Sequence, residues 1–204
     1  PEVDLIQQGV RQQETNFGDL IADIVRKETG AQAGLINGGS IRTGVPRGTI
    51  TARQIYAALP FNNYLVAVRM SGSRLLEALE HGVSGIENEE GRFPQVSGIR
   101  FVFDPTRPVG KRVLSVTLDG RALVPDQEYS VATLDFIAAG GAGYTSFGDA
   151  IRSSGDFSEV AGAMISSRLV YNAPGRFLGD VVLETLGNGT AIRPLTDGRI
   201  TRWR

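Results

Sequence analysis

The chain has 204 residues, of which 41% are hydrophobic, and a formal net charge of −1. This length and composition suit one folded domain spanning 1–204 and exclude a disordered chain. The near-neutral charge gives no long-range attraction to nucleic acid or to an anionic membrane. Apolar runs such as 65–68 are far too short to span a bilayer, and the lack of cysteine excludes disulfides and thiolate metal sites. Because the first residue is Pro1 rather than Met, we expect a fragment or a processed form.

The first elements in chain order are a helix and a short strand. An apolar stripe over 16–29 predicts a helix that Asn16 caps, with Asp19 in its first turn, and Gly30 is expected to end it. Residues 33–36 are apolar and predict a strand that leads into a glycine-rich turn.

The next segment predicts helix, strand and helix. Thr51 and Gln54 have the spacing of a capping box, so we expect a second helix that ends before Pro60. Residues 64–70 alternate as a strand does. The apolar face of a third helix is expected to comprise Leu75, Leu76 and Leu79.

The second half is expected to begin with strands and end with helices. Alternation and turn signals predict strands at 99–103, 113–118 and 129–133. Helices are expected at 157–171 and 176–186, followed by a polar tail at 187–204. Because helices and strands mix without strict βαβ alternation, we predict an α+β fold, a mixed sheet with several flanking helices.

Three separated segments carry residues typical of a binding site for a flat ligand. They are 37–42, 60–63 and 135–144, and each places an aromatic ring or a guanidinium beside residues that favour tight, exposed turns. Glycine lacks Cβ, so a ligand can approach the backbone closely there. Phenylalanines held on such loops are suited to stack on a nucleobase, and a nearby arginine to bind a phosphate or a ribose.

At these residues the chain resembles the C-terminal, substrate-binding domain of the 5'-nucleotidase family, which includes UDP-sugar hydrolases and cyclic-nucleotide phosphodiesterases. The resemblance covers roughly 11–190 and consists of several motifs in one order. The matching blocks are Arg11 with 16–23, then 37–42, 59–63, 91–98 and 136–144. One Gly-Gly pair is weak evidence, but five ordered blocks are a specific signal.

The resemblance implies a nucleotide or nucleoside ligand and a role for particular residues. Phe61 and Phe136 are expected to clamp the base, and stacking is worth on the order of 1–3 kcal/mol per base. Arg11 and Arg42 are expected to contact the ribose and the phosphates, because a planar guanidinium pairs bidentately with phosphate.

Smaller contributions are expected from amides and glycine backbones. Asn37 and Asn63 are implied to meet the base or the ribose, although both are also good turn residues, and for Asn63 the two interpretations stay open. Gly39 belongs to the glycine motif beside Arg42, and Gly91 is implied to line the base pocket with its backbone.

The chain departs from the family pattern at three positions. Ala142 stands where the pattern places an aspartate on the ribose hydroxyls, which indicates that ribose recognition differs, since alanine accepts no such hydrogen bonds. Ser40 replaces the third glycine of its motif, and Gln7 stands where some members have another arginine.

Catalysis is not expected in this chain alone. Family hydrolysis uses a divalent metal pair (for example Zn, Mn, Co or Mg), which clamps the attacking and leaving oxygens and sits on a separate N-terminal metallophosphatase domain. His81 is the only histidine; it lies outside every matched motif, and we expect it on a solvated helix surface. We therefore expect no catalytic residue, no metal site and no activity in the isolated chain. The resemblance implies that the parent enzyme is extracytoplasmic.

Two alternatives remain from the sequence. One is a hydrolase of the same family that acts on UDP-sugars, cyclic nucleotides or dinucleotides, an alternative motivated by Ala142. The other is a non-catalytic nucleoside-binding or interaction module, motivated by Ala142 together with Gln7.

Overall fold

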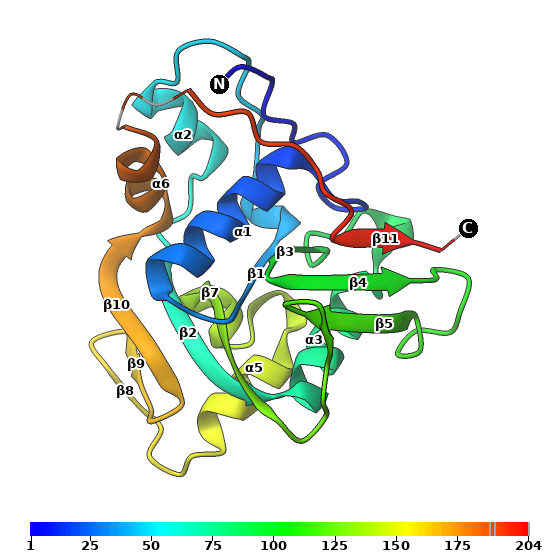
Figure 1. Ribbon diagram of the computed structural model, residues 1–204. Coiled ribbons are helices and arrows are strands. Elements are labelled where there is room, and N and C mark those ends of the chain that lie inside the picture. Colours follow the sequence, from blue (N-terminus) through cyan, green and yellow to red (C-terminus); the bar gives the residue numbers. More distant parts are fainter. Residues whose placement is uncertain (188, 190, 204) are drawn as a thin grey trace.

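The computed structural model in Figure 1 describes residues 1–187, 189 and 191–203. Its main sheet has five strands in the order β10-β2-β7-β1-β3. The bounds are β1 Ala33–Asn37, β2 Tyr64–Ser71, β3 Pro94–Ser97, β7 Glu128–Leu134 and β10 Leu169–Phe177. Strands β1 and β7 are parallel and the other neighbours antiparallel, so the sheet is mixed.

Two smaller sheets flank this one. The order of the first is β11-β4-β5-β6, and β8 and β9 form a separate hairpin. The bounds are β4 Ile99–Phe103, β5 Val113–Leu118, β6 Arg121–Ala122, β8 Ser158–Val160, β9 Ala163–Ile165 and β11 Ile200–Arg202. Asp119 and Gly120, both with positive φ, make the expected turn between β5 and β6.

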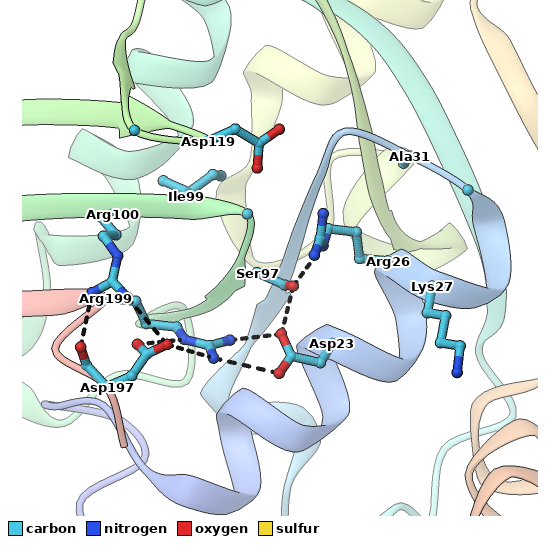
Figure 2. Close-up of a pocket in the computed structure, with 13 residues that line it drawn as sticks. Asp23, Arg26, Lys27, Ala31, Ser97, Ile99, Arg100, Asp119, Asp197 and Arg199 are labelled. Atoms are coloured by element: carbon cyan, nitrogen blue, oxygen red, sulfur yellow. Dashed lines mark hydrogen bonds and ion pairs between the residues drawn. The ribbon is translucent and has the colours of Figure 1, made fainter. Parts of the chain in front are cut away.

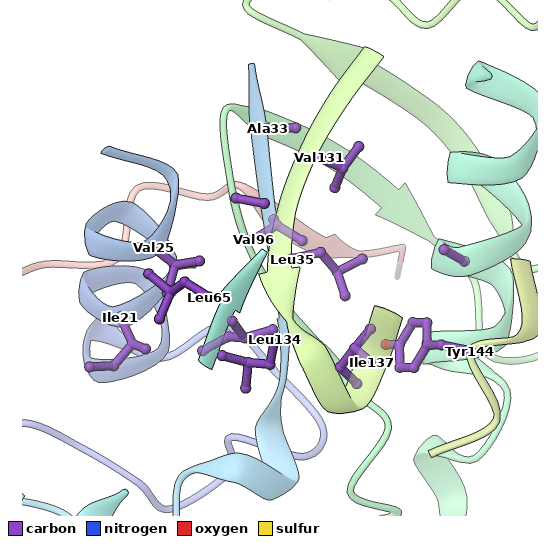
Figure 3. Packing of buried hydrophobic residues seen from close by; sticks show 14 of the residues in the cluster. Ile21, Val25, Ala33, Leu35, Leu65, Val96, Val131, Leu134, Ile137 and Tyr144 are labelled. Carbon is purple, nitrogen blue, oxygen red and sulfur yellow. The ribbon is translucent and has the colours of Figure 1, made fainter. Parts of the chain in front are cut away.

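Helices cover both faces of the main sheet. Helix α1 packs on β1, β3 and β7, whereas α3, α4 and α5 pack around β2 on the opposite face (Figures 1 and 3). The bounds are α1 Asn16–Thr29, α2 Ala52–Ala58, α3 Gly72–Val83, α4 Asp135–Ala138, α5 Thr145–Arg152 and α6 Leu178–Leu186. Short 3-10 turns occur at η1 Gly38–Ser40, η2 Ile86–Asn88 and η3 Gly141–Gly143. The predicted α+β class is confirmed.

The core fills the space between these layers. Figure 3 shows Ile21 and Val25 of α1 next to Leu65 and Leu134 of the central strands, and all four side chains are fully buried. Burying a leucine or isoleucine contributes roughly 1.5–3 kcal/mol, so this layer anchors the strands that carry the loops described below. None of the helices among the described residues has the length and apolarity needed to cross a membrane.

The α1 cap differs from the expectation. Thr15, not Asn16, is the N-cap residue, and its Oγ1 accepts a hydrogen bond from Gly18 N at 3.0 Å. Asn16 is used for tertiary contacts instead, since its Oδ1 accepts from Ile6 N at 2.9 Å and its Nδ2 donates to Asp4 O at 2.8 Å. At α2, by contrast, the capping box formed by the residues at 51 and 54 is present as predicted.

The helix predicted at 157–171 is wrong. Ala161 and Gly162, with φ of +51° and +80°, reverse the chain between β8 and β9, and β10 then pairs with β2. Val160 and Met164 stand four apart, a helical spacing, but the segment reaches a sheet edge where pairing satisfies its backbone.

Other corrections are small. Helix α6 begins at Leu178 rather than at residue 176, because Phe177 still pairs with β2. Leu76 is 38% exposed, so it does not belong to the buried face of α3. The sequence patterns do not predict helix α5. Of the tail expected at 187–204, residues 188, 190 and 204 lie outside the described residues, and β11 adds a strand to the second sheet.

The strand directions bring four loops together at one end of the strands of the main sheet. Leu65 pairs with Leu134, so β2 begins where β7 ends. Asn37, the last residue of β1, pairs with Pro94, the first of β3, and β1 runs parallel to β7. Four loops therefore meet at this end of the strands, namely 38–42, 60–63, 88–93 and 135–143.

Candidate functional site

A cavity of about 540 Å³ lies between these four loops. All nine residues singled out from the sequence as substrate-binding line it. They are Arg11, Asn37, Gly39, Arg42, Phe61, Asn63, Gly91, Phe136 and Ala142, joined by Ser40, Glu90, Arg92 and Gly143. The structure thus brings together residues that are up to 131 positions apart (11 to 142), and we call this space the aromatic cavity.

Two phenylalanine rings form the apolar part of the aromatic cavity. Phe61 is 47% exposed and Phe136 is 44% exposed, although a phenylalanine is usually buried. Asp135 links the segments that carry them, because its Oδ1 accepts a hydrogen bond from Tyr64 N at 3.1 Å. Burial raises the pKa of Asp135. Two solvated rings held on braced backbone are an arrangement that can take a planar ligand.

Close backbone contact forms one wall. Gly39 N donates to Gly91 O at 2.8 Å, and a Cβ placed on Gly39 would lie 2.9 Å from Gly91 Cα, so this approach requires glycine. Asn37 is 5% exposed, and its Nδ2 also donates to Gly91 O, at 2.9 Å, while its Oδ1 accepts from Ser40 Oγ at 2.6 Å. The Asn37 amide therefore braces this wall and keeps one N–H and one lone pair for a ligand.

The loop at 140–143 contributes another part of the lining. Gly140, Ala142 and Gly143 have φ of +98°, +52° and +84°. A Cβ on Gly141 would lie 2.4 Å from Phe136 O and 2.5 Å from its ring, so glycine there lets the ring lie against the loop. Ala142 occupies the left-handed region that aspartate and asparagine tolerate better than alanine.

His81 holds this loop, which corrects the expectation of a solvated surface residue. It is half-buried, its Nε2 lies 2.8 Å from Ala142 O, and its ring meets that of Tyr144 edge-on at 5.0 Å. Tyr144 Oη in turn donates to Arg92 O at 2.5 Å, and burial raises the pKa of Tyr144. Two partly buried hydrogen bonds therefore connect α3, the loop at 140–143 and the loop at 88–93.

The aromatic cavity has an excess of positive charge. Arg11, Arg42 and Arg92 line it, against the single carboxylate of Glu90, which pairs with Arg92. Arg11 Nη1 donates only a long bond of 3.4 Å, to Glu89 O. None of the ion pairs among the described residues involves Arg42. Such guanidinium groups are suited to bind an anion.

Comparison with known proteins decides the family. The model of "5'-nucleotidase, C-terminal domain" matches residues 2–149. The chain belongs to this family. A "Trifunctional nucleotide phosphoesterase protein YfkN" of Bacillus subtilis is 41% identical over 150 residues, which are 69% of this chain and 10% of that protein. A "Snake venom 5'-nucleotidase" of Crotalus adamanteus is 34% identical over 159 residues, 67% of this chain and 27% of that protein.

A solved structure agrees with the fold. The crystal structure of a 5'-nucleotidase precursor from Thermus thermophilus aligns with a TM-score of 0.82 at 35% identity, over 98% of this chain and 38% of that one. The present chain therefore corresponds to only part of each of these relatives and is the C-terminal domain of the family. The resemblance identified from the motifs is confirmed.

The residues of this 5'-nucleotidase domain do not fit a metal pair in the aromatic cavity. Within the described ranges one group could hold an ion, namely Glu14, Asp19 and Asp197, and none of the three lines the cavity. His81 is engaged with Ala142 O. The motifs assign no role to Glu90, Arg92 or His81. The only sequence signal for Glu90 and Arg92 is that they flank the matched Gly91, and none points to His81.

Proposed function

We propose that the aromatic cavity binds the nucleoside part of a nucleotide, with the base stacked between Phe61 and Phe136. One observation carries this proposal: two phenylalanines from distant segments are each nearly half exposed and line one cavity together with several guanidinium groups. Aromatic stacking tolerates every base, so the clamp gives affinity with little base preference.

Polar groups around the clamp would orient the rest of the ligand. Arg42 and Arg11 hold the phosphates and the ribose, because their side chains line the cavity without a carboxylate partner among the described residues. The Asn63 carbonyl accepts from Leu178 N at 2.9 Å, which fixes its backbone, while its side chain faces the cavity and contacts the base or the ribose. Gly91 contributes backbone only.

Hydrolysis is assigned to another part of the parent protein. We propose that the whole chain, 1–204, is one substrate-binding domain, and that an N-terminal metallophosphatase domain supplies the metal pair. The cavity supports this division because its described residues offer no histidine–carboxylate ligand set, and its one side-chain hydroxyl, Ser40 Oγ, donates to the Asn37 amide rather than to a base. The isolated chain then binds without turnover, and a metal-supplemented phosphatase assay that detects turnover would contradict the proposal. An extracytoplasmic location is proposed from the family resemblance alone.

Calorimetric titration of the chain with adenosine and AMP tests the binding proposal. Phe61→Ala and Phe136→Ala should each weaken binding about 5- to 150-fold, the equivalent of about 1–3 kcal/mol of stacking. Trp203→Ala is the matched control, because Trp203 is 61% exposed and does not line the cavity. Absence of binding heat, or equal affinities for all four proteins, would favour a module that has lost nucleotide binding.

Ala142 favours a second candidate, a ligand whose sugar is recognised differently. UDP-sugars, cyclic nucleotides and dinucleotides are the substrates to compare with 5'-nucleotides on the full-length enzyme. Ala142→Asp should strengthen adenosine binding roughly tenfold, because a carboxylate accepts hydrogen bonds from both ribose hydroxyls and aspartate suits φ of +52°. Unchanged affinity would mean that the ribose does not lie at this loop.

A further inference from the structure

The aromatic cavity contains a carboxylate to which neither the stacking rings nor the phosphate-binding arginines give a role. Among the described residues that line the cavity, Glu90 is the only acid. Its Oε2 pairs with Arg92, and its Oε1 has no hydrogen bond within the described part of the chain. Because stacking between two rings tolerates every base, a preference for one base requires a polar group of this kind at the base edge.

The loop at 88–93 holds the backbone of Glu90 in one place. Glu90 N donates to Gly85 O at 3.3 Å, and Phe93 N donates to Glu90 O at 3.3 Å. The preceding residue, Glu89, has φ of +50°, a left-handed conformation that is costly for a residue with a side chain. Strain of this kind persists where the surroundings fix it, and it is concentrated at ligand sites.

The carboxyl group of Glu90 is positioned from two sides. A Cβ on Gly85 would lie 2.6 Å from Glu90 Cδ and 2.8 Å from its Oε1, although φ of −113° at Gly85 is open to any residue. Glycine there therefore makes room for the carboxyl group. Arg92 donates from Nη2 to Glu90 Oε2 and from Nη1 to Ser84 Oγ, at 3.2 Å. The Glu90 side chain is still 36% exposed, so the carboxylate is both fixed and accessible.

Charge separates the two ends of the ligand within the cavity. A carboxylate repels phosphate, so the anionic end of a nucleotide is expected beside Arg42, which has no carboxylate partner among the described residues. The charges of Glu90 and Arg92 balance each other, and the pair offers acceptors next to donors. Such a pair suits an uncharged edge that carries donors and an acceptor side by side.

We infer that Glu90 makes the aromatic cavity selective for guanine nucleotides, an inference that rests on the proposed function. Guanine carries two neighbouring donors on its Watson–Crick edge, N1–H and the N2 amino group, and a carboxylate offers two neighbouring acceptor oxygens. The next atom along the same edge, O6, is an acceptor and suits the guanidinium of Arg92.

The other bases match Glu90 less well. Adenine and cytosine each present one amino group beside a ring nitrogen that is itself an acceptor, and uracil presents one N–H between two carbonyls. An acceptor facing the carboxylate is repelled and leaves one oxygen without a donor, which lowers the affinity for those bases. Hypoxanthine keeps N1–H and O6 but lacks the amino group, so comparing it with guanine isolates one hydrogen bond.

The test is calorimetric titration of the chain with GMP, IMP and AMP. GMP should bind at least about tenfold more tightly than IMP or AMP, the effect expected of a hydrogen bond to a charged group. Glu90→Gln should bring GMP and IMP to within about threefold of each other, because an amide has one acceptor oxygen and cannot serve both donors. Glu77→Gln is the matched control, since Glu77 is exposed on α3 and does not line the cavity.

Gly85→Ala tests the position of the carboxylate without changing the charge of the cavity. The added Cβ would displace the Glu90 carboxyl group, whereas the backbone at this residue tolerates alanine. The ratio of GMP to IMP affinity should therefore fall, and the affinity for AMP should not.

Two outcomes would overturn guanine selectivity, namely equal affinities of the wild type for GMP and IMP, or a preference for GMP that Glu90→Gln leaves unchanged. Phe61→Ala then shows which claim has failed. If it still weakens AMP binding, the stacking clamp stands and only the selectivity assigned to Glu90 is wrong. If none of the three nucleotides binds, the proposed function fails and guanine selectivity fails with it.

Discussion

The aromatic cavity and the charged groove shown in Figure 2 are both hollow and both lined by arginines, yet they differ in how those arginines are used. The charged groove is the larger, about 710 Å³ against about 540 Å³. In it, Arg100 and Arg199 are paired with carboxylates, and Arg26 Nε donates to Ser97 Oγ at 2.8 Å. In the aromatic cavity Arg42 has no such partner among the described residues, and two phenyl rings are exposed. Exposed rings beside an arginine that has no carboxylate partner, rather than volume, therefore distinguish the aromatic cavity from the charged groove.

The largest expected effect is the loss of stability when a carboxylate-paired arginine of the charged groove is removed. Arg199→Ala leaves Asp23 and Asp197 without their common cation, and the Arg199 side chain is only 11% exposed. Removing one partner of a buried ion pair typically costs about 3–5 kcal/mol, equivalent to a fall in Tm of roughly 6–20 °C for a chain of this size. Thermal unfolding checks this, with the exposed Arg202→Ala as control; adenosine affinity at 25 °C should be unchanged.

The second effect is a pH dependence of the free energy of unfolding that arises at Asp19. The folded protein keeps the Asp19 proton up to about pH 9, whereas the unfolded chain loses it near the usual 3.8. The folded state therefore binds more protons in this window, so the stabilisation is fully present below about pH 4 and declines as the pH rises toward 9. The wild type and Asp19→Asn should differ by this slope in urea unfolding. Parallel profiles would contradict it.

The third effect tests Arg42, the arginine of the aromatic cavity that has no carboxylate partner among the described residues. Arg42→Gln should weaken AMP binding about 10- to 150-fold, since a hydrogen bond to a charged group is worth about 1.5–3 kcal/mol. Adenosine, which has no phosphate, should lose much less. Arg53→Gln is the matched control because it is exposed on α2 and outside the cavity. An equal loss for both ligands would place Arg42 away from the phosphate.

The smallest effect concerns His81, whose contact with Ala142 O supports the loop at 140–143. His81→Ala removes the bond to Ala142 O, worth about 0.5–1.5 kcal/mol, and should weaken adenosine binding by up to about tenfold. His81→Gln can donate from its amide nitrogen and should restore most of the affinity. Calorimetry of the two variants separates positioning from a general loss of stability. If the glutamine variant is no better than the alanine variant, His81 acts only by packing against Tyr144.

Most of the fold could be predicted from local signals in the sequence. The helix at 16–29, the capping box at 51 and 54, and the strands at 99–103 and 113–118 follow from periodicity and turn chemistry, which act over a few residues. The helix predicted at 157–171 failed because β8 pairs with β9 across the turn at Ala161 and Gly162, and because the start of β10 pairs with β2, about a hundred positions away.

Like the fold, the candidate site has residues that the sequence predicts and residues that it does not. Motifs located Phe61, Phe136 and Arg42, because loop residues of unusual type stand out in a sequence. His81 and Asp19 did not stand out, since a lone histidine on a helix and an acid in a first helical turn are ordinary there. Their contacts with Ala142 and the C-terminal segment exist only after strands and tail are placed.

The position of the base is the most direct test of the account. Heteronuclear NMR of the chain with bound adenosine should give nuclear Overhauser contacts from the base protons to ring protons of both Phe61 and Phe136, with base signals shifted upfield by the two rings. Adenosine that binds without contacts to either ring, or with contacts to one ring only, would contradict a base stacked between them.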